Sequence, residues 1–198
     1  MFSIVVLISG GGSNLRALLE AAADADFPAR IVAVGSDTDA PGLEHAEAFG
    51  VPTFTVVPTA FADRATWGDE LLTHVQSWSP DLVVCAGFMR ILPPRFVAAL
   101  SPNLINTHPA LLPAFPGAHA VRDALAAGVS ETGVTVHIID EGVDTGPVLL
   151  QRAVPVLSAD TEHDLHERIK IVERSLLVEA VADIATAHIT TEQQETVS

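Results

Sequence analysis

The sequence predicts an α/β fold: an open, mostly parallel twisted sheet with helices on both faces. Continuous apolar runs of strand length recur through the first half of the chain. Segments with apolar residues at helical spacing separate these runs, and such alternation favours a parallel sheet. Nearer the C-terminus, two strand-like segments follow one another with only a short loop between them, which predicts an antiparallel pair.

The first half of the chain is expected to be Rossmann-type. The apolar, β-branched runs predict strands at 3–9, 30–36, 53–57, 81–87 and 103–106. Between them we expect one helix capped by Ser13 and further helices at 41–50, 63–78 and 93–102.

The second half adds a helix at 119–128 and strands at 133–140 and 147–156. Thr161 and Asp164 have the spacing of a capping box, so a last helix is expected from there to about residue 183. No linker or repeat interrupts the pattern. We therefore expect a single domain over 1–185 and a loose polar tail over 186–198.

The composition restricts the function. A formal net charge of −15 repels nucleic-acid phosphates, so DNA and RNA are not expected as ligands. No apolar run reaches membrane-span length, and no basic residue precedes the first apolar run, which therefore reads as a buried strand rather than a signal peptide. The only cysteine, Cys85, lies in an apolar run and is expected to be a core residue. A reducing cytoplasm fits this cysteine usage.

A glycine-rich loop, ISGGGSN at 8–14, links the first strand to the first helix. Its backbone N–H groups could cradle a phosphate at the helix N-terminus. It is not a Walker loop, because no Gly-Lys-Ser/Thr follows, and it is not a dinucleotide fingerprint, because Leu15 occupies the position of the third glycine. A single phosphate on a small substrate fits it better, although an ordinary tight turn would also explain the glycines.

The segment AGFMRIL, residues 86–92, follows a buried strand at the edge where open α/β sheets bind ligands. Its apolar side chains and the single cation Arg90 could hold a flat ring that carries an anionic group. The alternative is that these apolar residues belong to the core.

The stretch NTHPALLPAFPGAH, residues 106–119, combines polar side chains with three prolines. Asn106 and His108 are two residues apart on an extended chain and so point the same way. They could stabilise a developing oxyanion, while Asp144, in a glycine-flanked loop, could hold the imidazole charged or accept a proton. The alternative is a stiff surface loop with an inert histidine.

Other chemistries have less support in the sequence. His163 and His166 lie on the last expected helix among acidic residues, where we expect a solvated face. No histidine or cysteine cluster has zinc-ligand spacing, so no metal is expected. The G-x-S-x-G nucleophile elbow of hydrolases is also missing.

These motifs together resemble a known family. ISGGGSNL, AGFMRIL, the pattern N-T-H-P-x-L-L-P-x-F-x-G and IDEGVDTGP are similar to motifs of the phosphoribosylglycinamide formyltransferases, folate-dependent enzymes of purine synthesis. The resemblance covers nearly the whole chain and rests most on the proline stretch and the downstream D-T-G-P. It implies a formyltransferase-like fold and transfer of a formyl group from 10-formyltetrahydrofolate, as co-substrate, to the amine of glycinamide ribonucleotide, without a metal.

The resemblance also implies roles for individual residues. The catalytic residues would be Asn106, His108 and Asp144. The ribonucleotide would be bound by Gly11, Gly12, Ser13, Asn14, Lys170 and Glu173. The folate would be bound by Arg64, Met89, Arg90, Ile91, Leu92, Asn106, Asp140, Glu141, Gly142, Val143 and Asp144. Departures are Ala110 in place of a serine, Ala114 in place of a basic or polar residue, and a shorter C-terminal tail.

Related functions remain open on the sequence. A formyltetrahydrofolate hydrolase is expected to carry an extra N-terminal domain, whereas the first strand here begins at residue 3. A methionyl-tRNA formyltransferase is expected to carry a C-terminal tRNA-binding domain and a more basic surface. A nucleotide-binding module would use only the glycine loop. The expected partners are small molecules, and the expected assembly is a monomer or weak homodimer.

Overall fold

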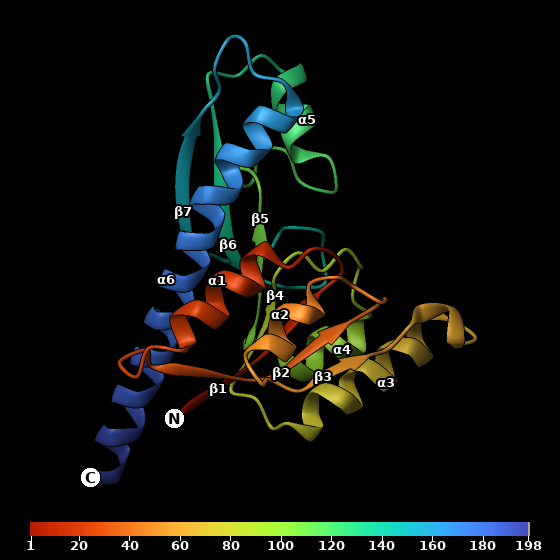
Figure 1. Cartoon of the computed structure of the whole chain (residues 1–198), viewed down its shortest axis with the longest axis vertical. Coiled ribbons are helices and arrows are strands. Elements are labelled where there is room, and N and C mark those ends of the chain that lie inside the picture. The colour runs from red at the N-terminus through yellow and green to blue at the C-terminus, as the bar shows by residue number, and fades with distance from the viewer. Residues whose placement is uncertain (198) are drawn as a thin grey trace.

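The computed structural model describes the backbone of residues 1–197 and the side chains of residues 1–191. At its centre is a seven-stranded sheet in the order β3-β2-β1-β4-β5-β6-β7 (Figure 1). Strands β1 to β5 run parallel, whereas β6 and β7 are antiparallel, as the sequence predicted. The strands are β1 (Phe2–Ile8), β2 (Ala29–Ser36), β3 (Thr53–Thr55), β4 (Leu82–Cys85), β5 (Leu104–His108), β6 (Glu131–Ile138) and β7 (Val148–Pro155).

Helices cover both faces of this sheet, which confirms the expected layers (Figure 1). One core cluster includes side chains of α1 and α6, and the other includes side chains of α3 and α4. The helices are α1 (Ser13–Ala22), α2 (Leu43–Ala48), α3 (Arg64–Ser77), α4 (Pro94–Leu100), α5 (Ala120–Ala126) and α6 (Glu162–Val197), with a short 3₁₀ turn at Pro58–Ala60.

Strand β1 shows why the apolar runs are continuous. All seven of its residues are buried. Successive side chains of a strand point to opposite faces, so Ile4 and Val6 enter one core while Val5 and Leu7 enter the other. Fully burying one such side chain stabilises the fold by about 1.5–3 kcal/mol.

The strand order has a switch point between β1 and β4. From β1 the sheet extends to β2 and β3 on one side and to β4 and β5 on the other. At such a switch point the loops after the two strands diverge to opposite faces and leave room for a ligand at the carboxyl edge. The glycine loop follows β1, and the segment 86–92 follows β4. The two loops also touch, because Ser9 N–H donates to the Gly87 carbonyl oxygen over 3.1 Å.

The last helix is longer than predicted. The expected end near residue 183 is wrong, because α6 continues through the expected polar tail to Val197. No glycine or proline follows Pro155, so nothing in this part of the sequence terminates a helix, and polar character alone does not do so. Ala185 is still fully buried. Side chains of the expected tail beyond residue 191 lie outside the described part of the structure.

The sequence predicted side-chain caps at the N-termini of α1 and α6, and only the cap of α6 is present. Thr161 and Asp164 form the predicted capping box, with Thr161 N–H donating to Asp164 and Asp164 N–H donating to the Thr161 hydroxyl. Ser13 is not a cap. Gly12 takes that position, in the left-handed conformation with φ 70°, and no side chain caps the helix.

The expected core position of Cys85 is confirmed by the structure. Cys85 is buried, and burial raises the pKa of its thiol to about 12, so it is a core residue and not a nucleophile. Among residues 1–197, no helix combines the length and apolar character needed to cross a membrane.

Candidate active site

The end of β5 presents Asn106 and His108 on one face of the sheet, as their spacing predicted. Their partners on antiparallel β6 are His137 opposite Asn106 and Thr135 opposite His108. Directly paired residues of antiparallel strands project to the same side. Four polar side chains therefore stand together on one face of the sheet, and His108, Thr135 and His137 are all buried.

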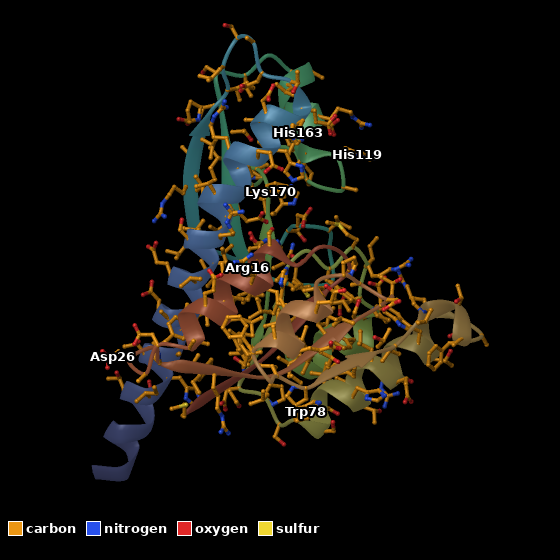
Figure 2. The ribbon with its side chains drawn as sticks, viewed as in Figure 1. Arg16, Asp26, Trp78, His119, His163 and Lys170 are labelled. Atoms are coloured by element: carbon orange, nitrogen blue, oxygen red, sulfur yellow. The ribbon has the colours of Figure 1, made fainter. Side chains whose placement is uncertain are left out.

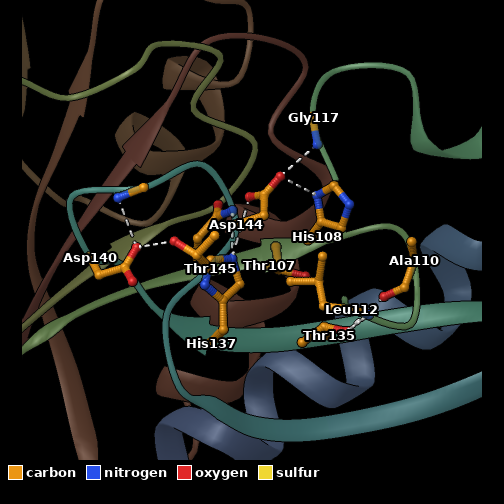
Figure 3. A network of polar contacts seen from close by, with 12 residues as sticks. Thr107, His108, Ala110, Leu112, Gly117, Thr135, His137, Asp140, Asp144 and Thr145 are labelled. Atoms are coloured by element: carbon orange, nitrogen blue, oxygen red, sulfur yellow. Dashed lines mark hydrogen bonds and ion pairs between the residues drawn. The ribbon is translucent and has the colours of Figure 1, made fainter. Parts of the chain in front are cut away.

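Asp144 reaches this group from the loop between β6 and β7 (Figure 3). Its Oδ2 lies 3.3 Å from His108 Nδ1 and accepts a hydrogen bond from the Gly117 N–H over 2.7 Å. Its Oδ1 lies 3.6 Å from His137 Nε2. The Asp144 backbone has φ 55°, a left-handed conformation that aspartate tolerates better than most residues. The structure thus brings the three predicted catalytic residues together.

The surroundings of Asp144 keep it ionised. Burial opposes its charge, but a hydrogen bond from His137, the Gly117 N–H and the adjacent His108 together lower its pKa below the ordinary 3.8. His108 Nε2 lies 2.8 Å from the Phe115 carbonyl oxygen. A carbonyl oxygen only accepts, so both ring nitrogens of His108 face hydrogen-bond acceptors.

The proline stretch is held against β6 by Thr135. The Thr135 hydroxyl donates to the Ala110 carbonyl oxygen over 2.7 Å and accepts the Leu112 N–H over 3.0 Å. Gln151 on β7 donates to the Leu112 carbonyl oxygen. Ala110 is fully buried in this arrangement, whereas Ala114 is exposed. The loop that carries Gly117 is therefore fixed to the sheet and is not a detached surface loop.

His137 and Thr135 were missed by the sequence reasoning. His137 Nε2 lies 3.3 Å from the Asn106 amide nitrogen, and its Nδ1 lies 3.0 Å from the Ile138 carbonyl oxygen. His137 therefore contacts both Asn106 and Asp144 and can hold them in place. The signal was present in the sequence: polar residues at alternate positions of an apolar strand indicate one polar face.

A second polar cluster lies on the opposite face of β5, the face that packs against α6. Thr107, which alternates with Asn106 and His108, donates to Glu173 Oε1 over 3.1 Å. Burial raises the pKa of Glu173, although hydrogen bonds from Asn14 and Thr107 oppose this. Asn14 Oδ1 is buried without a partner in the described structure, so it is available to a donor on a ligand. Lys170, one turn before Glu173, pairs with Glu167 over 2.7 Å.

The glycine loop next to this cluster depends on close backbone packing. The Gly42 N–H donates to the Gly10 carbonyl oxygen over 3.0 Å. A Cβ on Gly12 would lie 2.9 Å from Gly42 Cα and 3.4 Å from His45 Cδ2, so no larger residue fits without movement. Gly11 and Ser13 complete the turn into α1, at whose N-terminus backbone N–H groups are available to an anion.

The segment 86–92 contains both buried and exposed apolar side chains. Phe88 and Leu92 are buried, so for these two the ordinary core interpretation holds. Met89 and Ile91 are 76% and 61% exposed, which is unusual for large apolar side chains and suits an apolar ligand. Arg90 Nε donates to Asp37 Oδ2 over 2.6 Å.

The loop 140–144 lies at the carboxyl edge of the sheet, and hydrogen bonds to its first residue, Asp140, fix its conformation. Asp140 Oδ1 accepts the Gly142 N–H over 3.0 Å and the Thr145 hydroxyl over 2.7 Å (Figure 3). Val143 is 49% exposed and Glu141 is exposed too. The loop therefore offers another exposed apolar side chain beside Asp144.

Some predicted or considered residues lie apart from these clusters. Arg64 is the first residue of α3, exposed, at the edge of the sheet where β3 ends. His163 and His166 lie on an exposed stretch of α6 (Figure 2 labels His163), as expected. Within the described residues, no group of three or more histidine, cysteine, aspartate or glutamate side chains has a geometry that could hold a metal ion.

Comparison with known proteins agrees with this architecture. The chain is 54% identical over 187 residues to the phosphoribosylglycinamide formyltransferase of Mycobacterium tuberculosis, covering 94% of this chain and 86% of the relative. It is 43% identical to the Escherichia coli protein of that name, covering 88% and 82%. The crystal structure of glycinamide ribonucleotide transformylase 1 from Symbiobacterium toebii superimposes with a TM-score of 0.92 at 42% identity, covering 94% of this chain and 89% of that one.

A family model gives the same result from a different comparison. The model described as formyl transferase matches residues 2–181, which include every strand of the sheet and both polar clusters. The match thus extends from β1 into α6 as one continuous unit. The chain belongs to the formyl transferase family.

Proposed function

We propose that this chain transfers the formyl group of 10-formyltetrahydrofolate to the amine of glycinamide ribonucleotide, in purine biosynthesis. The observation that carries the proposal is the meeting of Asn106, His108 and Asp144 at the carboxyl edge of a formyl transferase fold. Its relatives are named for this activity.

The proposed roles follow from the groups that each side chain offers. As the amine nitrogen attacks the formyl carbon, negative charge builds on the formyl oxygen. The Asn106 amide nitrogen carries N–H hydrogens and can donate one of them to that oxygen. The His108 imidazolium supplies a second, charged donor, and the ionised Asp144 favours its positive charge.

Protons must balance in this reaction. The C–N bond to the folate breaks as the new C–N bond forms, so one proton leaves the attacking amine and one reaches the folate nitrogen. Asp144 and His108 lie where they can accept and return that proton, directly or through water. In the present arrangement His108 Nε2 faces Phe115, so this nitrogen must exchange the Phe115 carbonyl oxygen for the formyl oxygen when substrates bind.

The two polar clusters provide separate places for the two substrates. The ribonucleotide phosphate fits the N–H groups of the loop Gly11 to Asn14 with Lys170 nearby in the α6 cluster, and the ribose fits Glu173. The family resemblance assigns the folate to Arg64, the segment 89–92 and the loop 140–144, in which Met89, Ile91 and Val143 present exposed apolar side chains. The folate supplies the activated formyl group, and no metal is assigned a role.

The remaining proposals concern the setting of the enzyme. We propose a cytoplasmic protein that acts on small molecules without nucleic acid or membrane partners. We propose a monomer or weak homodimer. The acidic composition and the single buried cysteine support the setting.

The test is a direct assay of the purified chain with glycinamide ribonucleotide and 10-formyltetrahydrofolate. We expect formylated ribonucleotide and tetrahydrofolate in equal amounts by mass spectrometry. His108→Ala should abolish most of this turnover, while His163→Ala, an exposed histidine outside the site, should not. Formate release without formylated ribonucleotide would instead identify a hydrolase, and no reaction would refute the proposal.

A further inference from the structure

Asp37 and Arg90 form an ion pair in which burial is very unequal. Arg90 Nε donates to Asp37 Oδ2 over 2.6 Å. The Asp37 side chain is 3% exposed, whereas that of Arg90 is 51% exposed. Asp37 follows β2 and Arg90 follows β4, so the pair crosses the loop that leaves β1 at the switch point of the sheet.

The arginine is the only charged partner that the described structure gives this carboxylate. Asp37 Oδ1 is buried and has no hydrogen-bond partner among the described residues. Burying a carboxylate with an oxygen left unsatisfied costs stability, and a buried ion pair is weak evidence of a stabilising role. The ion pair is therefore not expected to stabilise the fold. Its main effect is on the conformation of the Arg90 side chain.

The contact fixes one edge of the guanidinium and leaves the other free. With Nε bound to Asp37, the two terminal Nη groups have no hydrogen bond to any described residue. A guanidinium held at Nε presents this planar pair of donors in a defined direction. Without Asp37, an exposed arginine side chain would sample many rotamers and lose that direction.

The backbone of the same segment is held independently. Met89 N–H donates to the Ser9 hydroxyl over 2.8 Å, and Ser9 N–H donates to the Gly87 carbonyl oxygen. The main chain of residues 87–89 is thus tied to the loop after β1. Loss of Asp37 should therefore release the Arg90 side chain and leave the path of the segment unchanged.

We propose that Asp37 is a positioning residue that orients the Arg90 guanidinium toward the folate co-substrate. The inference rests on the proposed function, which places the folate against residues 89–92. Asp37 itself touches no substrate in this proposal. It acts through Arg90, so its removal should affect folate affinity and leave both ribonucleotide affinity and the turnover number unchanged.

The experiment measures tetrahydrofolate binding by titration calorimetry, independently of catalysis. Asp37→Ala should weaken binding about tenfold, the effect expected from losing one hydrogen bond to a charged group. Asp37→Asn should largely restore affinity, because its amide oxygen can still accept from Nε. In an Arg90→Ala background, Asp37→Ala should cause no further loss, because the residue it orients is missing.

A matched control is the Asp69–Arg95 pair, which joins α3 and α4 over 2.8 Å and is exposed. Asp69→Ala should leave tetrahydrofolate affinity unchanged. Melting temperatures of all variants distinguish a merely structural role, which would lower stability without selective loss of the folate.

Two outcomes would overturn the inference, and they differ. If the wild-type chain does not bind tetrahydrofolate, the proposed function fails and the inference fails with it. If the wild type binds and Asp37→Ala binds equally well, or loses affinity additively with Arg90→Ala, only the positioning role is refuted.

Discussion

His108 Nδ1 lies 3.3 Å from Asp144 Oδ2, although one residue ends β5 and the other lies on the loop after β6. The Gly117 N–H holds the same carboxylate oxygen, and the low Asp144 pKa keeps that group charged. The charge of Asp144 is therefore available to His108 across the neutral pH range, and consequences for catalysis follow from it.

Replacing His108 or Asn106 with alanine should lower kcat with little change in KM for either substrate. Both side chains are proposed to meet charge that exists only in the transition state, so ground-state binding depends on them much less than turnover does. Loss of a single oxyanion donor typically lowers the rate about 10²–10³-fold. Steady-state kinetics measure both parameters, and unimpaired turnover of His108→Ala would return the proline stretch to a purely structural role.

Asp144→Asn should change the shape of the pH–rate profile as well as its height. In the wild type the Asp144 pKa is held below 3.8, so its carboxylate contribution persists down to that pH and is lost only as the pH falls through the lowered pKa. The amide has no charge at any pH, so it cannot favour the imidazolium form of His108. The profile of kcat against pH for the two proteins checks this.

The double variant His108→Ala with Asp144→Asn should lose much less activity than the product of the single losses. Residues that serve one step are non-additive, because the second loss removes a group that has already lost its function. Fully multiplicative losses would show that the two residues act independently.

Gly12→Val should weaken ribonucleotide binding and leave tetrahydrofolate binding nearly unchanged. Gly12 has φ 70°, and any Cβ there would lie 2.9 Å from Gly42 Cα, so the loop must move. Gly50→Ala is the control: that glycine has φ 69° but open space around it at the end of α2. It should lower stability through backbone strain without touching ribonucleotide affinity. Equal losses of both ligands in Gly12→Val would contradict the division of the cleft.

Exhaustive chelation should leave the rate unaltered. The proposed mechanism assigns stabilisation of the developing charge to Asn106 and His108, so it requires no Lewis acid. The measurement is kcat after dialysis against a strong chelator. A loss that one specific metal restores would refute the mechanism.

We propose that the domain needs no residue beyond 191. A chain that stops after residue 191 should keep its melting temperature and activity. A chain that stops after Leu177 loses the buried Ala180, Val181 and Ala185. Its melting temperature should fall by about 5 °C or more in calorimetry, since burying one valine is worth about 1.5–3 kcal/mol. Equal melting temperatures for the two truncations would place the domain boundary earlier.

The strand and helix pattern was readable because burial on both faces produces continuous apolar runs, as in β1. The meeting of Asn106 and His108 followed from alternation along one extended strand. Strand order was not readable in this way, since nothing local shows that β4 lies beside β1. The contact of Asp37 with Arg90 depends on that order and was therefore missed.

The partners of the catalytic residues could not be predicted from the sequence for a similar reason. His137 faces Asn106 only because β6 pairs antiparallel with β5 in one particular register. A shift by one residue would turn His137 to the opposite face. The end of α6 was predicted too early because a run of polar residues was taken as the end of the helix, whereas glycine and proline are the residues that end helices.

The ring of Phe2, at the start of β1, packs against that of His188 near the end of α6, with centroids 5.1 Å apart. In a parallel sheet the amino end of β1 lies opposite the edge where the glycine loop and His108 stand, and Figure 1 shows the N-terminus and the last described turns of α6 at the lower left of the view. An affinity tag, a surface tether or a second enzyme joined to either end would therefore extend away from the cleft. Substrates would keep their access when the protein is immobilised by its termini.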